Sequence, residues 1–205
     1  GMVEATIALH YVFESPKDKI VYDVGHQAYA HKILTGRREA FKKNRMKDGL
    51  SGFPKIDESE YDAFGAGHSS TSISAALGLS YAAKLQGIQE KVVALIGDGA
   101  LTGGMAYEAL NNAAQIKKNF IIVLNDNEMS ISRNVGGMSK YLSSVRTKEG
   151  YAELKLRVER TLSAIPVIGR PLVCGLYQLK NGIKQFLVPG MLFEDMGITY
   201  LGPVD

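Results

Sequence analysis

The sequence has only one cysteine, Cys174, and no hydrophobic run longer than a β-strand. One thiol cannot form a disulfide within the chain, which is typical of proteins from a reducing compartment such as the cytosol. The longest apolar runs, at 92–96 and 120–124, fall far short of the roughly 18 to 20 apolar residues of a membrane span. The first residues also lack a basic stretch followed by an apolar one, so no secretory signal is expected. These absences predict a cytoplasmic protein that does not interact with a membrane.

The chain has little net charge, +3 at pH 7, although basic residues crowd between positions 32 and 47. These residues are Lys32, Arg37, Arg38, Lys42, Lys43, Arg45 and Lys47. A solvated helix face is favoured for this basic cluster over a rim that guides anions. Nucleic-acid binding is disfavoured, because aromatic side chains are not interleaved with the charges as a single-strand platform requires. The content of 45% hydrophobic and 22% charged residues is ordinary for a globular domain.

Alternating strand and helix patterns predict an α/β fold, in which a parallel sheet is flanked by helices. The predicted strands are at 20–23, 91–96, 120–124 and 198–201. The predicted helices are at 3–13, 69–85, 104–114 and 190–196, with a shorter helical segment around 29–34. Strands 91–96 and 120–124 are uniformly apolar and are expected to be buried. The helix between these two strands indicates a right-handed parallel crossover.

Apolar residues recur at helical spacing in the first predicted helix, at Val3, Ile7 and Tyr11. Two later segments are less regular. Glycine, proline and serine favour a loop from 48 to 67. Between 140 and 190, proline and glycine interrupt the helical stretches, which predicts a partly mobile helical excursion over the sheet.

Polar residues follow two neighbouring strands of the predicted sheet, at the point where each strand ends. Asp98 stands between Gly97 and Gly99 directly after one strand, and Asn127 follows the next. Because the carboxyl ends of parallel strands meet at one edge of a sheet, these oxygens can reach one ion together. Carboxylate and amide oxygens suit Mg²⁺, and the main-chain carbonyl of Met129 is a candidate third ligand. A lone Gly-Asp-Gly is usually a plain turn. Here it follows a strand and is followed by a helix, a second strand and Asn127, and this order predicts a site for Mg²⁺ and a diphosphate.

Other nucleotide and metal motifs do not fit the sequence. A dinucleotide fingerprint requires a glycine where Thr102 stands, and the Gly-Lys-Ser/Thr of a P-loop is absent. His26 and His31 are five residues apart, off the i to i+4 spacing of a helical zinc pair, so zinc is rejected. Cys174 has no recognisable nucleophile context and is interpreted as structural.

The segment Gly67-His68-Ser69-Ser70 introduces the long predicted helix. Unpaired N–H groups at a helix start can bind an anion, Gly67 allows a flat ring or a phosphate to approach, and His68 can donate a hydrogen bond. The two serine hydroxyls can equally be simple helix caps. His26, taken alone, fits a packed core histidine better than a ligand-binding one.

Several longer segments surround these residues. They are DVGHQAYAHKILTGRR, ESEYDAFGAGHSSTSISAALG, VVALIGDGALTGGMAYEALNNA, VLNDNEMSIS and LFEDMGITYLGPVD. In them the chain closely resembles the 1-deoxy-D-xylulose-5-phosphate synthase family, of the transketolase-like thiamine diphosphate superfamily. The resemblance is to the amino-terminal, diphosphate-binding domain of that family, and it is weakest from 146 to 184. It implies that 1–205 is one diphosphate-binding domain, incomplete at both ends relative to the family.

The resemblance implies thiamine diphosphate and Mg²⁺ as cofactors. By this resemblance, Asp98, Asn127 and the Met129 carbonyl hold the Mg²⁺. The residues implied to line the cofactor are His26, Gly67, His68, Ser69, Gly99, Ala100 and Asn127. No catalytic residue is expected within this chain, because the family's further histidine and its ring-activating glutamate belong to segments that the chain does not match.

The implied activity is a transketolase-type transfer by a cytoplasmic homodimer. Pyruvate condenses with glyceraldehyde 3-phosphate, with loss of CO₂, in isoprenoid-precursor and thiamine biosynthesis. Because the chain matches only a part of the family's length, it is expected to be inactive alone. Two alternatives stay open: a non-catalytic remnant that serves as an interaction module, and a subunit of a split transketolase-type enzyme. The HKILTGR and NDNEMSIS segments disfavour the second.

Overall fold

The computed structural model describes residues 1–116, 119–126, 137, 141 and 191–201. The chain divides into two compact units, residues 1–134 and 135–205. The first unit contains the sheet and most of the described helices. None of the helices in the described residues combines the length and the apolar composition that a membrane span needs.

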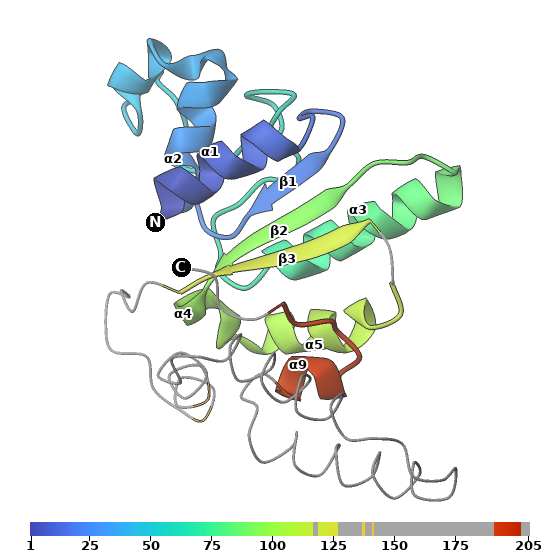
Figure 1. The fold of residues 1–205 in the computed structure, drawn as a ribbon. Helices are drawn as coiled ribbons and strands as arrows, with labels where there is room; N and C mark the ends of the chain where they lie inside the picture. The colour runs from blue at the N-terminus through green and yellow to red at the C-terminus, as the bar shows by residue number, and fades with distance from the viewer. Residues whose placement is uncertain (117–118, 127–136, 138–140, 142–190, 202–205) are drawn as a thin grey trace, which may run out of the picture. The chain divides into compact units, whose positions relative to one another are not determined.

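The sheet of the first unit is parallel and, in the described residues, has three strands in the order β1-β2-β3 (Figure 1). These are β1 (Lys19–Tyr22), β2 (Val92–Gly97) and β3 (Phe120–Asn125). Every residue of the central strand β2 is buried, which is why its sequence is apolar without alternation. The predicted α/β fold and the parallel crossover from β2 to β3 are therefore confirmed, while the handedness of the crossover stays a prediction.

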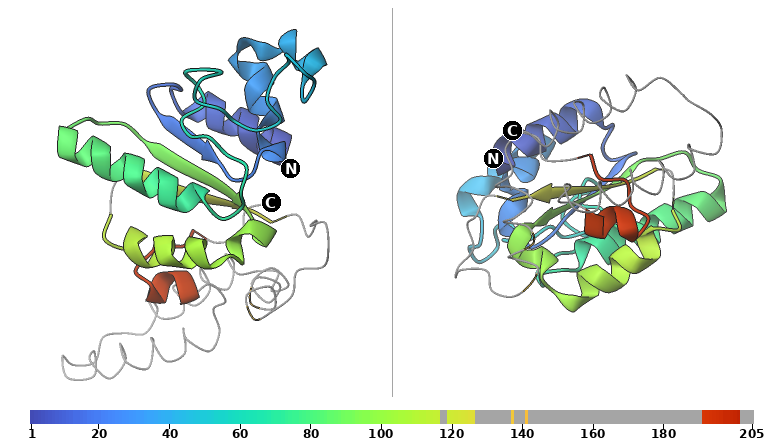
Figure 2. Two further views of the ribbon diagram at one scale, coloured as in Figure 1. Left: turned by 180° about the vertical axis from the view of Figure 1, so that it is seen from behind. Right: turned by 60° about the horizontal axis from the view of Figure 1, so that its bottom comes forward.

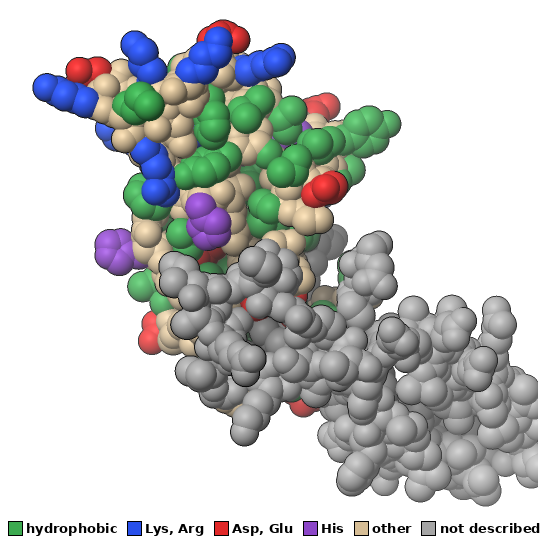
Figure 3. Space-filling view, turned by 90° about the vertical axis from the view of Figure 1, so that its left-hand side faces the viewer, with side chains coloured by type: hydrophobic (Ala, Val, Ile, Leu, Met, Phe, Trp, Pro, Cys, Tyr) green, Lys and Arg blue, Asp and Glu red, His purple; other side chains and the backbone are tan. Residues whose placement is uncertain are grey.

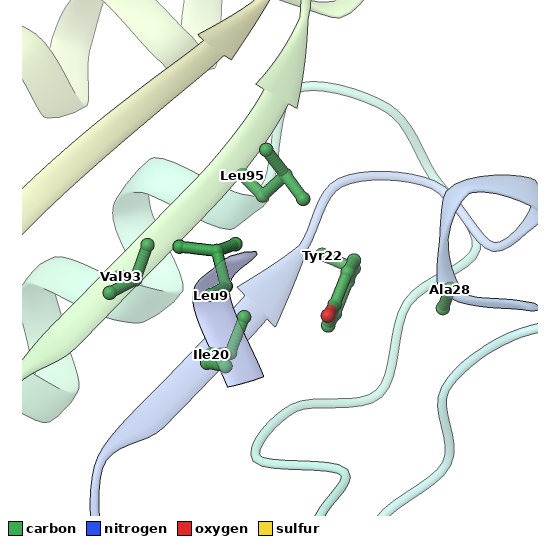
Figure 4. Close-up of a cluster of buried hydrophobic side chains, with 6 residues drawn as sticks. All are labelled: Leu9, Ile20, Tyr22, Ala28, Val93 and Leu95. Carbon is green, nitrogen blue, oxygen red and sulfur yellow. The ribbon is translucent and has the colours of Figure 1, made fainter. Parts of the chain in front are cut away.

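The helix α1 (Met2–Val12) covers one face of the sheet (Figure 1). Alternate residues of a strand point to the same face, so Ile20 and Tyr22 of β1 lie with Val93 and Leu95 of β2. Together with Leu9 of α1 and Ala28, they form the buried cluster of Figure 4.

The helices α3 (Ser72–Gln86) and α5 (Gly104–Ala113) lie on the opposite face (Figure 2). Ile73 and Ala76 of α3 are fully buried, and Leu110 of α5 is nearly so. The predicted helices at 69–85 and 104–114 are thus present, although α3 begins three residues later than expected. The first helix ends at Val12, one residue before its predicted end.

Two apolar segments are more exposed than their sequences indicate. Ile121 of β3 is 41% exposed and the rest of this strand is half-buried, so the prediction that β3 is buried is wrong for the described structure. The reason is that β3 is an edge strand of the described sheet, whereas β2 has a strand on each side. On α1, the regularly spaced Val3, Ile7 and Tyr11 are exposed, and Leu9 faces the core instead.

A series of short helical turns follows β1. They are η1 (His26–Ala28), α2 (Tyr29–Lys32), η2 (Ile33–Arg37) and η3 (Ala40–Lys43). The expected helical segment around 29–34 is present, and it is interrupted at Thr35 and Gly36, whose backbone angles are not helical. The following stretch to Thr71 has neither helix nor strand, as the loop prediction for 48–67 required.

The longest described element of the second unit is the helix α9 (Met191–Asp195). It confirms the short helix predicted at 190–196. The ring of Phe193 packs against the rings of Tyr141 and Tyr200. The strand predicted at 198–201 is wrong, because Ile198 donates its backbone N–H to the Phe193 carbonyl and closes the helix end instead. Apart from Tyr141, the predicted excursion at 140–190 lies outside the described residues.

Leu95 tests how far the fold depends on the central strand. It is fully buried on β2, the strand between β1 and β3, in the cluster that contains Leu9 of α1. We expect Leu95→Ala to reduce the free energy of unfolding by about 2–5 kcal/mol, through lost burial and the cavity that remains. Urea denaturation followed by circular dichroism would measure this change.

Leu85→Ala is the matched control, because Leu85 on α3 is 85% exposed. Its expected effect is within about 0.5 kcal/mol. Equal losses from the two substitutions would contradict the assignment of β2 as the centre of the core.

Candidate functional site

Three segments of the chain meet at the carboxyl edge of the sheet. They are residues 23–28 after β1, residues 67–71 before α3, and residues 97–103 after β2. Gly97 pairs with Asn125, so Asp98 and Asp126 continue from the ends of adjacent strands, as the sequence predicted. Asp98 is 6% exposed and begins the short helix α4 (Asp98–Leu101). Asn127 and Met129, the other predicted Mg²⁺ ligands, lie outside the described residues.

The start of α3 is held by a carboxylate from the end of β1. Asp23 is fully buried and accepts the backbone N–H groups of Ser70 at 2.8 Å and Ser72 at 3.0 Å. The prediction that serine hydroxyls cap this helix is wrong, because Asp23 satisfies the free amides instead. An external anion therefore cannot use these two amides, and the helix begins at Ser72 instead of Ser69.

Ser70 links the start of α3 to the turn after β2. Its hydroxyl donates a hydrogen bond to the Ala100 carbonyl at 2.6 Å. A Cβ atom at Gly103 would lie 2.1 Å from the Ser70 hydroxyl oxygen, so only glycine fits there. Ser70 also has a positive φ of 70°, a conformation that L-residues rarely adopt without support.

Gln27 occupies the space beside the Gly-Asp-Gly turn. A Cβ atom at Gly97 would lie 2.9 Å from Gln27 Nε2, so Gly97 permits the close approach of this side chain. Among the described residues, the buried Oε1 of Gln27 has no hydrogen-bond partner. This oxygen can therefore accept a hydrogen bond from a bound molecule at the sheet edge where the site was predicted.

Other predicted site residues are on the surface. His26, Gly67, His68 and Ser69 are exposed, and Gly99 and Ala100 are half-buried. The interpretation of His26 as a core histidine is therefore wrong. Nothing lies within 4 Å of a Cβ atom placed on Gly67, so the space beside its backbone is open. Exposed histidine side chains are visible among hydrophobic ones on the face shown in Figure 3.

A second group of polar residues is buried beneath α2. Arg37 donates to both carboxylate oxygens of Asp62, at 2.7 and 2.8 Å, and to Glu58 at 3.0 Å. His31 contacts Asp62 at 3.0 Å and His10 at 2.8 Å. Lys32, with no exposed surface, donates to the Ser51 carbonyl and to Glu58. We call this group the buried ion network.

The network changes the interpretation of the basic cluster at 32–47. Lys32 and Arg37 are buried and form ion pairs, so the prediction of a solvated helix face is wrong for these two residues. The other five members, Arg38, Lys42, Lys43, Arg45 and Lys47, are exposed. Lys and Arg side chains gather at one end of the face in Figure 3, as a solvated surface requires.

Electrostatics within the network favour the ionised carboxylates. Burial alone would raise the pKa of Asp62, but hydrogen bonds from Arg37 and His31 outweigh it and hold that pKa well below its usual range. Burial, with the neighbouring His31, lowers the pKa of His10. Burial would likewise raise the pKa of Glu58, but hydrogen bonds from Lys32 and from the Ser51 backbone outweigh it and lower that pKa, so the network favours the charged form of both carboxylates.

The carboxyl edge of the sheet offers a candidate ligand for a hard cation and open space for a bound molecule. Asp98 supplies a carboxylate oxygen at a strand end, the kind of ligand that Mg²⁺ prefers. The open space at Gly67 and the unsatisfied Gln27 Oε1 leave room and a hydrogen-bond acceptor for a bound molecule. The roles of Asn127 and Met129 stay predictions.

Comparisons with known proteins place this architecture. Transketolase from Leishmania mexicana shares the fold with a TM-score of 0.50 and 23% sequence identity, over 62% of this chain and 22% of that one. The fold is thus of the transketolase-like α/β type. A sequence model described as 1-deoxy-D-xylulose-5-phosphate synthase matches residues 1–205. The chain belongs to the 1-deoxy-D-xylulose-5-phosphate synthase family.

Curated relatives of the same description agree along the whole chain. The protein of Carboxydothermus hydrogenoformans is 63% identical over 205 residues, and that of Syntrophomonas wolfei is 58% identical over the same length. The chain spans 33% and 32% of the lengths of these two relatives. It therefore corresponds to about a third of such a protein.

The sequence did not reveal the residues that hold the segments of the predicted site together. Asp23 could have been found, since it is an acidic residue directly after a predicted strand. Gln27 and Gly103 gave no local signal, and Ser70 was considered only as a helix cap, because the partners of all three are distant in sequence. The buried ion network was also missed, since its paired side chains are 21 to 31 residues apart in the sequence.

Arg37 provides a test of the buried ion network. Removing its guanidinium leaves the buried Asp62 carboxylate without its main partner. We expect Arg37→Ala to lower the free energy of unfolding by about 3–5 kcal/mol. Arg38→Ala, at the neighbouring exposed residue, should change it by less than about 0.5 kcal/mol. Urea denaturation at neutral pH measures both.

The pH dependence gives a further check on the same pair. Because the pKa of Asp62 is lowered, its contribution to stability is complete above the ordinary value of 3.8 and is lost as the pH falls below it. The wild-type chain should therefore lose more stability than Arg37→Ala between about pH 5 and about pH 3. Parallel losses would show that Arg37 does not set the pKa of Asp62.

Proposed function

We propose that the chain is the part of a 1-deoxy-D-xylulose-5-phosphate synthase that binds Mg²⁺ and the diphosphate of thiamine diphosphate. In this proposal the whole enzyme condenses pyruvate with glyceraldehyde 3-phosphate, with loss of CO₂, for isoprenoid-precursor and thiamine biosynthesis. The observation that carries the proposal is the buried carboxylate of Asp98 at the end of the central strand. Membership of the family along all 205 residues supports it.

Asp98 would hold Mg²⁺ together with Asn127 and the Met129 carbonyl. A single carboxylate among neutral oxygens suits a metal whose remaining ligands are phosphate oxygens, because the phosphates already bring negative charge. The residues that would contact the cofactor are His26, Gly67, His68, Ser69, Gly99, Ala100 and Asn127. Bound thiamine diphosphate supplies the nucleophilic carbon that the condensation needs.

The chain's own contribution is to bind and orient. The exposed His26 and His68 can donate hydrogen bonds from two different segments, and the space beside the Gly67 backbone is open. Asp98 is nearly buried, so its attraction to a cation is less screened than at the surface. No described residue is assigned a proton-transfer step in this proposal.

The proposed enzyme is a cytoplasmic homodimer, and the chain supplies one of its domains. Two other interpretations are possible for a chain that matches a third of its relatives. One is a non-catalytic remnant that has lost cofactor binding. The other is a subunit of a split transketolase-type enzyme. Measuring the binding of thiamine diphosphate to the chain separates the remnant from the proposal. Testing which substrates the assembled enzyme converts separates the split transketolase-type subunit from it.

Asp98→Ala tests the metal site. Isothermal titration calorimetry should detect binding of thiamine diphosphate to the chain in the presence of Mg²⁺. With Asp98→Ala we expect the affinity to fall by more than about 100-fold, the upper end of the effect of groups that only support a metal ligand. The loss should be reproduced in the unmodified chain when Mg²⁺ is replaced by a chelator.

Asp57→Ala is the control, because Asp57 is an exposed carboxylate in the loop at 48–67. It should bind the cofactor as the unmodified chain does. Unchanged binding by Asp98→Ala would defeat the metal assignment, and no binding by the unmodified chain would favour the remnant.

Turnover by the isolated chain is the second test. We expect no 1-deoxy-D-xylulose 5-phosphate to form from pyruvate and glyceraldehyde 3-phosphate, since no catalytic residue is expected in this chain. Product would be measured by mass spectrometry against a complete family member. Sustained formation by the 205-residue chain would refute its assignment as a binding part only.

A further inference from the structure

Ser70 joins two segments that the proposed function assigns to the cofactor, the loop at 67–69 and the short helix α4. It follows Ser69 directly, and its hydroxyl is bonded to the carbonyl of Ala100 at 2.6 Å. Ser70 itself is only 7% exposed, whereas Gly67, His68 and Ser69 are exposed. Packing of their own side chains therefore does not fix the loop at 67–69, and the nearest buried anchor is Ser70.

The position of Ser70 is set from two further directions. The buried Asp23 carboxylate accepts its backbone N–H at 2.8 Å. Gly103 lies so close that a Cβ atom there would be 2.7 Å from the Ser70 Cβ. These contacts hold Ser70 at a φ of 70°, which is unfavourable for serine in isolation. An unfavourable conformation that three segments maintain together is typical of a functional constraint.

We propose that Ser70, oriented by Asp23, is a positioning residue that fixes the loop at 67–69 against the turn at 98–100. The inference rests on the proposed function and deepens it, because it explains how two separate segments can bind one Mg²⁺ and thiamine diphosphate together. Neither Ser70 nor Asp23 contacts the cofactor in this proposal. Their effect passes through the backbone of Ala100 and the start of α3.

Ser70→Gly is the most informative variant. Glycine adopts a positive φ without strain, so the substitution removes the hydroxyl while the backbone conformation stays accessible. We expect the affinity for thiamine diphosphate with Mg²⁺, measured by calorimetry, to fall about 10- to 100-fold, as is typical of residues that orient a metal site. The midpoint of thermal unfolding should stay near that of the unmodified chain. Ser74→Ala, further along α3, is the control and should bind normally.

A double-mutant cycle with Gly103 separates positioning from general destabilisation. Gly103→Ala places a methyl group on the Ser70 hydroxyl and should also weaken binding. In the Ser70→Gly chain the same substitution meets no hydroxyl and no Cβ atom, so it should have little further effect. Independent structural damage would instead give additive losses.

Hydrogen exchange keeps this inference separate from the proposed function. In the absence of any cofactor, Ser70→Gly should speed amide exchange at 98–103 while exchange in β2 is unchanged. If the unmodified chain binds no cofactor, the proposed function fails, and the exchange result alone decides whether Ser70 couples the two segments. Binding by Ser70→Gly equal to that of the unmodified chain, or unchanged exchange at 98–103, would overturn the inference.

Discussion

The carboxyl edge of the sheet depends on one interaction, the acceptance of two backbone N–H groups by the buried carboxylate of Asp23. A buried charge is costly unless it is hydrogen-bonded, and here the start of α3 supplies the donors. The same contact satisfies amides that a helix start otherwise leaves unpaired. Through Ser70 it extends to Ala100, so the ends of β1 and β2 and the start of α3 form one connected unit.

The buried ion network has a comparable role at the side of the sheet. Much of the HQAYAHKILTGR segment, which carried the family resemblance, serves this network: His31, Lys32 and Arg37 contact carboxylates of the 48–67 loop region. Polar and charged groups removed from water need close partners, and each of these three side chains has one. These family-specific residues therefore support the loop that leads to Gly67, while His26 alone of that segment is assigned to the cofactor.

The sequence predicted the elements well where a local signal was strong. Uniform apolar runs identified β2 and β3, and the glycine turn at Asp98 fell at the end of a strand, as expected. The exposure of β3 and of α1 could not be predicted, because burial depends on which surfaces meet and not on apolar spacing. The cap on α3 was predicted from the wrong residue, since its true partner, Asp23, is 47 residues away in sequence from Ser70.

Departures from local preference gather at the site. Among the described non-glycine residues with positive φ, Asp48 and Asn119 are of types that tolerate it, and Arg45 lies in the loop after η3. The other two, Val24 and Ser70, adjoin Asp23 in sequence or by hydrogen bond. The unsatisfied Gln27 Oε1 belongs to the same edge. Proteins keep such locally unfavourable features mainly where function requires them, so these observations point to the edge beside Asp98 without reference to any relative.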